Sequence, residues 1–147
     1  MATQTHQYAS MQHSPFLSGS AGKTSRTIPL DIEAANLTAG SRFNFILLPP
    51  DAVVTNVYLA ADELDVDATE TLTLNIKAEN EDGTETVTLL SASDVAQDGG
   101  VVEAGSNLPI LTRDQNYYLF VDVQAGAEEA QEGNMRLLVE WFRSRED

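Results

Sequence analysis

A strict alternation of polar and apolar residues between Thr71 and Ala78 constrains the fold more than any other part of the sequence. Leu72, Leu74 and Ile76 occupy every second position of this stretch, and Ala78 completes the series. Successive side chains of a β-strand point to opposite faces, so the stretch predicts a strand with one dry and one solvated face. Such strands are typical of antiparallel sheets rather than of buried parallel ones.

The same alternation returns in residues 85–90, after a polar connection that contains Asp82-Gly83. An Asp-Gly pair suits a turn that needs positive φ, and we therefore predict a β-hairpin over residues 69–90. Threonines fill its solvent-side positions, where a branched Cβ fits the pleated surface and the hydroxyl stays hydrated.

Further strands are predicted on both sides of the hairpin, separated by turn residues. They lie at 26–32, 43–48, 53–59, 107–112, 115–124 and 134–143, and one helical turn is expected over 91–97, with Ser91 or Ser93 as N-cap. About eight short strands with almost no helix indicate an all-β fold, an antiparallel two-sheet β-sandwich. A jelly-roll topology is our first expectation and a Greek-key sandwich the second. The short link 49–52 leaves open whether its flanking strands pair as a hairpin or cross between sheets.

The length of 147 residues is enough for one independent core, which we place in residues 26–147. Residues 1–25 are rich in small polar residues and lack periodicity, so we expect an extended N-terminal arm. The chain has no cysteine, which excludes disulfides, thiolate metal ligands and a cysteine nucleophile. Without a signal-like start or a long apolar run, we expect a soluble protein with no membrane partner.

Charge differs in sign between the arm and the body. Residues 1–30 contain Lys23 and Arg26 and no acid. Residues 31–147 contain all 23 acids and only six Lys or Arg, and the net charge of the whole chain is -15. Since nucleic-acid affinity comes largely from Lys and Arg contacts to phosphates, so acidic a body argues against a nucleic-acid partner.

The arm has few side chains with which to fold on its own. Its few sizeable apolar residues include Tyr8, Phe16 and Leu17. Burial of so little surface does not offset the entropy lost on ordering, so we expect a neighbouring subunit or another protein to hold the arm. The alternative is that it folds back on its own domain.

No constellation of residues predicts catalysis, so we expect a protein that is not an enzyme and has no cofactor. His6 and His13 both lie in the arm, away from any organised acid. Asp122 and Glu140 lie on long strands beside Phe120 and Phe142, and a hydrolase would need them to face one another in a cleft.

Two features of the sequence could indicate a binding site, an acidic segment for a metal ion and the aromatic residues for a sugar. Five carboxylates fall within residues 62–70, a density that suits Ca²⁺, but the spacing and glycine of an EF-hand loop are missing, and a plain acidic loop is the main expectation. A sugar platform would need exposed aromatics. The possible residues are Tyr58, Tyr117, Tyr118 and Trp141, of which Trp141 falls in the core phase.

The chain as a whole resembles small β-sandwich virion proteins of tailed bacteriophages, of the head decoration or cement type. The resemblance runs over residues 47–142 and is carried by segments 47–59, 71–77, 89–96, 108–112 and 135–142. It implies an accessory protein that oligomerises, often as a trimer, and sits on the exterior of the capsid, on the lattice of the major capsid protein.

Several residues are expected at interfaces in such an assembly. Tyr8, Phe16 and Leu17 would anchor the arm, Lys23 and Arg26 would meet acidic groups, and Leu138 and Phe142, apolar on the wet phase of the last strand, would be covered by another subunit. The rival interpretation is a glycan- or receptor-binding domain of a phage tail appendage.

Overall fold

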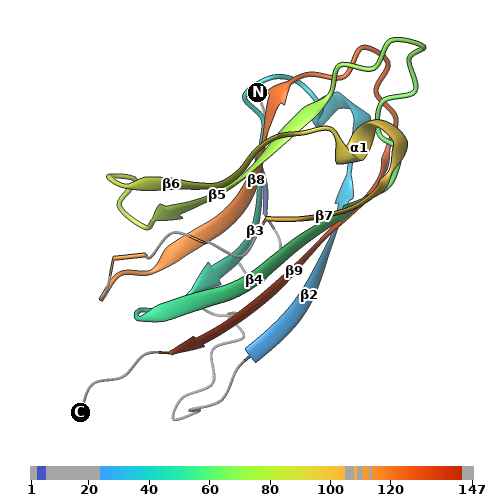
Figure 1. Cartoon of the computed structure of the whole chain (residues 1–147). Coiled ribbons are helices and arrows are strands. Elements are labelled where there is room, and N and C mark those ends of the chain that lie inside the picture. The colour runs from blue at the N-terminus through green and yellow to red at the C-terminus, as the bar shows by residue number, and fades with distance from the viewer. Residues whose placement is uncertain (1–2, 6–23, 105–107, 109–110, 113, 144–147) are drawn as a thin grey trace.

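The computed structural model is a sandwich of two sheets (Figure 1), and it describes residues 3–5, 24–104, 108, 111–112 and 114–143. One sheet, sheet A, has the strand order β1-β3-β8-β5-β6, and the other, sheet B, has the order β2-β9-β4-β7. The strands are β1 (Thr3–Thr5), β2 (Thr24–Ile32), β3 (Arg42–Leu48), β4 (Ala52–Ala61), β5 (Thr73–Asn80), β6 (Thr86–Ser93), β7 (Gly100–Glu103), β8 (Tyr117–Ala125) and β9 (Gly133–Arg143). The predicted antiparallel β-sandwich is thereby confirmed.

From β2 to β9 the chain changes sheet at every connection except the β5–β6 hairpin. That hairpin is the one predicted from the Thr71–Ala78 alternation, and Gly83 in its turn has the positive φ of 73° that the sequence called for. The link between β3 and β4 is a crossover between sheets, which settles the alternative left open by residues 49–52. All described strand pairs are antiparallel apart from β1 with β3.

The core lies between the sheets and is built from the alternating positions. On β5 and its approach, Leu72, Leu74, Ile76 and Ala78 are each 0% exposed. The last strand repeats the pattern with buried Met135, Leu137, Val139 and Trp141. These rows lie on the inner faces of opposite sheets and belong to the main hydrophobic cluster.

Two predicted elements are placed differently in the structure. Of the strand expected at 107–112, the structure describes only residues 108 and 111–112, and these lie outside any strand. The fourth strand of sheet B is β7, which pairs with β4. The helix is α1 (Val95–Asp98) with Asp94 as N-cap, because β6 continues through Ser91 to Ser93. Strand β7 (Gly100–Glu103) is too short and too weakly apolar to show a periodic pattern in the sequence. It is a strand because it pairs with β4, which is a tertiary contact.

Strand β1 is the described part of the N-terminal region, and it pairs in parallel with β3 at one edge of sheet A. Residues 6–23, most of the predicted arm, lie outside the described residues. Strand β2 begins at Thr24, close to the boundary expected after residue 25.

No helix in the described part of the chain has the length and hydropathy that a membrane span needs.

Neighbouring leucines on β9 give a direct test of the two faces. Leu137 is 0% exposed in the core, and Leu137→Ala is expected to lower the free energy of unfolding by about 2–5 kcal/mol because it leaves a cavity. Leu138 lies on the other face and is half-buried, so Leu138→Ala should cost about 1 kcal/mol or less. Urea denaturation of both variants measures the difference, and equal losses would contradict this assignment of faces.

Candidate interaction surfaces

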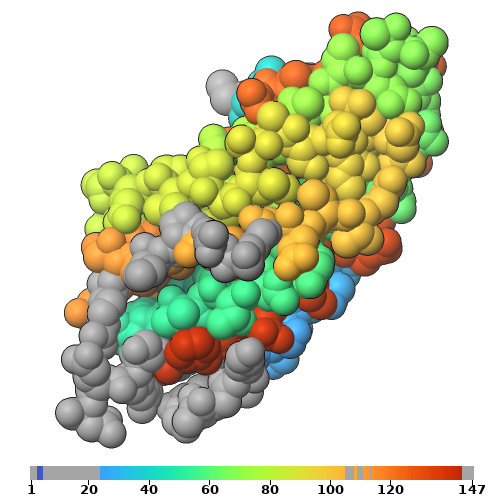
Figure 2. All heavy atoms as spheres, in the orientation of Figure 1, coloured from blue at the N-terminus to red at the C-terminus, as the bar shows by residue number. Residues whose placement is uncertain are grey.

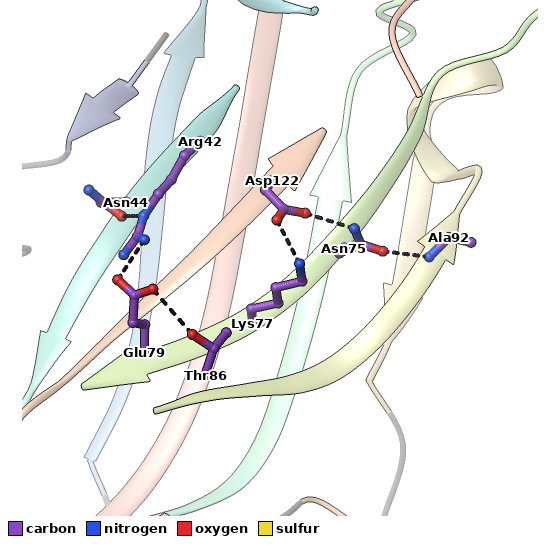
Figure 3. Close-up of polar contacts among 8 residues, drawn as sticks. All are labelled: Arg42, Asn44, Asn75, Lys77, Glu79, Thr86, Ala92 and Asp122. Atoms are coloured by element: carbon purple, nitrogen blue, oxygen red, sulfur yellow. Dashed lines mark hydrogen bonds and ion pairs between the residues drawn. The ribbon is translucent and has the colours of Figure 1, made fainter. Parts of the chain in front are cut away.

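The outer face of sheet A carries a polar network made of two groups of contacts (Figure 3). Arg42 of β3 donates from Nη1 to Glu79 Oε1 at 2.8 Å and from Nε to Asn44 Oδ1 at 2.6 Å. The second oxygen of Glu79 accepts a hydrogen bond from the Thr86 hydroxyl at 3.2 Å. These contacts link β3, β5 and β6 through their outward side chains, and they leave this part of the face well hydrogen-bonded.

A second group of contacts continues the network along β5 (Figure 3). Asp122 of β8 accepts from Lys77 Nζ at 2.8 Å and from Asn75 Nδ2 at 2.7 Å. The Asn75 side-chain carbonyl accepts from the Ala92 backbone N–H at 2.9 Å, where the ladder between β5 and β6 is irregular. Both cations of the network therefore lie against carboxylates and contribute little net charge to this face.

Two large apolar side chains of sheet A are buried without belonging to the core. Phe120 is 3% exposed and Leu47 is 1% exposed, yet neither joins the hydrophobic cluster between the sheets. The guanidinium of Arg42 lies 3.6 Å from the centroid of the Phe120 ring, so a hydrogen-bonded cation covers that ring. A bulge between Asn44 and Ile46 shifts the phase of β3 and puts Leu47 opposite Tyr118 on the outer side.

The outer face of sheet B differs because apolar side chains run across it. We call this group the sheet B patch; it consists of Val53, Tyr58, Ala60, Val101, Leu138 and Phe142. The strand register places Val53 beside Phe142, Tyr58 beside Leu138, and Val101 beside Ala60. Val101 is 67% exposed and Val53 is 37% exposed. Figure 2 shows the flank on which β6, α1 and β7 lie above β4 and β9.

The predicted interface residues are distributed as follows. Leu138 and Phe142 both lie half-buried on the outer side of sheet B, as parts of the patch. Arg26 lies apart from them: it is the register partner of buried Val139, and its Nη1 donates to the Ser25 carbonyl at 3.0 Å. The remaining four, Tyr8, Phe16, Leu17 and Lys23, lie outside the described residues.

Sequence reasoning missed Val53, Tyr58 and Val101 as members of the patch. Val53 is followed directly by Val54, so the sequence does not indicate which of the two faces outward. The bulge between Val54 and Asn56 decides it. Val101 lies in the strand that the sequence did not predict.

The two acids weighed for hydrolysis do not share a cleft. Asp122 is on the outer face of sheet A, whereas Glu140 is on the outer face of sheet B and accepts a hydrogen bond from the Thr55 hydroxyl at 2.9 Å. Arg136, two positions from Asn134 on the same strand, donates from Nη1 to the Asn134 side-chain oxygen at 3.2 Å.

The aromatic residues likewise do not form one platform. Tyr117 and Trp141 are 1% and 2% exposed. Tyr58 and Tyr118 are half-buried on the outer faces of opposite sheets.

The acidic loop 62–70 is organised by one buried carboxylate. Asp65 is 0% exposed, although the sequence predicted a plain acidic loop here. It accepts backbone N–H bonds from Asp67, Thr71 and Leu72 at 3.3, 2.9 and 3.2 Å. Burial opposes its ionisation, but these donors and the N–H of Glu129 outweigh burial and lower the pKa of Asp65.

Asp65 also joins this loop to the β8–β9 connection. Its side chain accepts from Glu128 N at 3.4 Å and Glu129 N at 3.2 Å, and its backbone forms an isolated bridge with Ala130. Across the described residues, no three His, Cys, Asp or Glu side chains are grouped as a metal site would require.

Two other acids respond to their surroundings in opposite directions. Burial, followed by the nearby carboxylate of Asp98, raises the pKa of Glu70. Hydrogen bonds from the Tyr117 hydroxyl at 2.7 Å and the Thr112 hydroxyl at 2.8 Å lower the pKa of Glu85. Glu85 therefore ties the β5–β6 hairpin to the start of β8.

Asp65→Ala is expected to lower the free energy of unfolding by about 2–4 kcal/mol at pH 7, since several backbone donors lose their acceptor. Because the pKa of Asp65 is lower in the folded chain, its ionised form stabilises the fold above the unfolded-state pKa. That contribution is lost as the pH falls below about 4 through the folded-state pKa. Denaturation curves at several pH values check both expectations.

Asp67→Ala is the matched control, because its carboxylate caps only the exposed N–H of Thr69, at 2.8 Å. It should cost about 1 kcal/mol or less. A gap between wild type and Asp65→Ala that stays constant down to pH 2 would contradict the assigned role of the Asp65 charge.

Comparison with known proteins finds solved structures of similar fold. No protein-family model matches the chain, and no curated protein sequence matches it. A chain in the solved capsid of Ralstonia phage GP4 is similar, with a TM-score of 0.78 and 22% identity over 98% of this chain and 99% of that one. A chain of the cyanophage Pam1 capsid asymmetric unit gives a TM-score of 0.68 and 24% identity over 89% of this chain and 91% of that one. The β-sandwich of this chain is thus a fold found in these two phage capsid structures.

Proposed function

We propose that this chain is a structural protein of a tailed-phage virion, a decoration or cement protein that binds and stabilises the outer capsid lattice. The observation that carries the proposal is the similarity to a chain of the Ralstonia phage GP4 capsid, which extends over 98% of the present chain. Its partners are the major capsid protein and further copies of itself, with a trimer as the favoured state. The proposal assigns it no catalytic role.

The outer face of sheet B is the proposed contact surface. Its apolar cross-strand pairs, Val53 with Phe142 and Tyr58 with Leu138, leave hydrocarbon at the surface of an otherwise strongly acidic chain. Coverage of such side chains by a partner removes them from water and favours association. The Thr55–Glu140 hydrogen bond lies between the two pairs and joins polar side chains of β4 and β9 there.

The outer face of sheet A is the proposed solvent side. Its cations lie against carboxylates, and Arg42 covers Phe120, so this face offers a partner little apolar surface. The contrast between the two faces supports one orientation, with sheet B toward the lattice and sheet A away from it.

The jelly-roll winding is part of the same proposal. Without β1, the sheets read β2-β9-β4-β7 and β3-β8-β5-β6, an eight-strand order that two Greek keys produce. The arm is the second proposed attachment, through Tyr8, Phe16, Leu17 and Lys23, and Arg26, just after the arm on β2, belongs to the same proposed contact.

Polar replacement in the patch tests the contact surface. Leu138→Gln and Phe142→Gln should each weaken binding to capsids about tenfold or more, because each removes an apolar contact of the proposed interface. Thr88→Gln on the exposed side of β6 is the control and should bind as the wild type does. Co-sedimentation with purified heads measures the affinities, and equal binding of all three variants would exclude sheet B as the contact.

The location of the protein in the virion tests the function itself. A decoration protein should be released from purified particles by mild denaturant while the shell stays closed, and should rebind to the stripped shell. Deletion of residues 1–25 should abolish rebinding. Loss of the shell together with this protein would instead assign it to the lattice, and its absence from particles would contradict the proposal.

A further inference from the structure

The three residues of β1 occupy a site formed by residues from other parts of the domain. Thr3, Gln4 and Thr5 lie in register with Arg42, Phe43 and Asn44 of β3, at the outer edge of sheet A. The next described strand, β2, belongs to the other sheet. This short strand is therefore held by backbone pairing at an edge, far from its neighbours in sequence.

The Gln4 side chain is held from two sides. Its Nε2 donates to the Asp31 carbonyl at 2.8 Å, and its Oε1 accepts from Asn36 Nδ2 at 2.9 Å. Asp31 is near the end of β2, and Asn36 closes the turn that leads toward β3. A glutamine is suited to this position because its amide both donates and accepts.

Among the described residues, the groups that pair with β1 or hydrogen-bond to Gln4 all come from residues 31–44. The acceptor site is therefore built without any residue of β1 itself. Eighteen residues, 6–23, connect β1 to β2, and a connection of that length can span up to about 60 Å. In an isolated chain the tether favours its own strand through an effective concentration in the millimolar range. Copies packed side by side offer each other the same strand at a similar concentration.

We propose that the β3 edge is an acceptor site for the N-terminal strand of a second copy of this chain, so that Thr3–Thr5 of one copy replaces β1 of its neighbour. The same hydrogen bonds form within a copy and between copies, which makes the exchange inexpensive in free energy. The partner is recognised by a Gln flanked by two residues able to adopt the extended conformation. Exchange of this kind would join neighbouring copies whatever larger structure they share.

The absence of native cysteine allows a clean cross-linking test with full-length chains. Thr3 pairs with Arg42, and Asn44 lies two residues further along the same strand, so thiols at Thr3 and Asn44 would be about 8 Å apart. Equal amounts of Thr3→Cys and Asn44→Cys protein are refolded together and treated with a bis-maleimide of that length. Covalent dimers are expected, in a yield that rises with protein concentration.

Thr88→Cys supplies the matched acceptor control, since β6 is the opposite edge of sheet A. Mixed with Thr3→Cys, it should give several-fold less dimer. Gln4→Glu in the Thr3→Cys chain should also lower the yield with Asn44→Cys several-fold, because a carboxylate cannot donate to the Asp31 carbonyl.

A chain that carries both Thr3→Cys and Asn44→Cys distinguishes strand exchange between copies from pairing within one copy, because exchange gives a cross-link between chains and internal pairing gives one within a chain. Its product should shift from monomer to covalent multimers as the concentration is raised. Monomeric product alone at every concentration, or equal dimer yields with Asn44→Cys and Thr88→Cys, would overturn the proposal. Both outcomes leave the capsid-binding test unaffected, because that test uses chains without cysteine.

Discussion

Burial of one face of each sheet against the other is the interaction on which the whole molecule depends. Leu74 and Ile76 of β5 and Leu137 and Val139 of β9 are completely removed from water, and this term outweighs the entropy of ordering the strands. Because strand side chains alternate, the inner face fixes which residues point outward but leaves their chemistry unconstrained. The two outer faces can therefore differ, and in this chain they do.

The sequence allowed the inner half of this arrangement to be predicted and little of the loops. The hairpin and the inward row of β9 follow from period-two patterns that burial enforces. Strand β7 and the outward position of Val53 could not be predicted, since one depends on pairing with β4 and the other on a bulge. Nor does any local signal distinguish Asp65 from the solvated acids around it, because its donors come from two separate loops.

The candidate surfaces show the same division. Leu138 and Phe142 were identified from the sequence because an apolar residue in a wet phase breaks a pattern, and the structure places them on the same face. Phe120 also breaks the pattern, yet Arg42 covers it within the chain. Only the three-dimensional register separates an apolar side chain that the fold itself covers from one that it leaves for a partner.

The paired charges on sheet A also affect how copies interact at a distance. Arg42 with Glu79, and Lys77 with Asp122, each cancel over 2.8 Å, so their combined field fades well within the Debye length of about 10 Å at 0.1 M salt. Two of the eight basic residues therefore contribute little to long-range attraction between copies. Repulsion between two copies at close range then comes from the remaining acids of the chain, and dissolved cations would screen it.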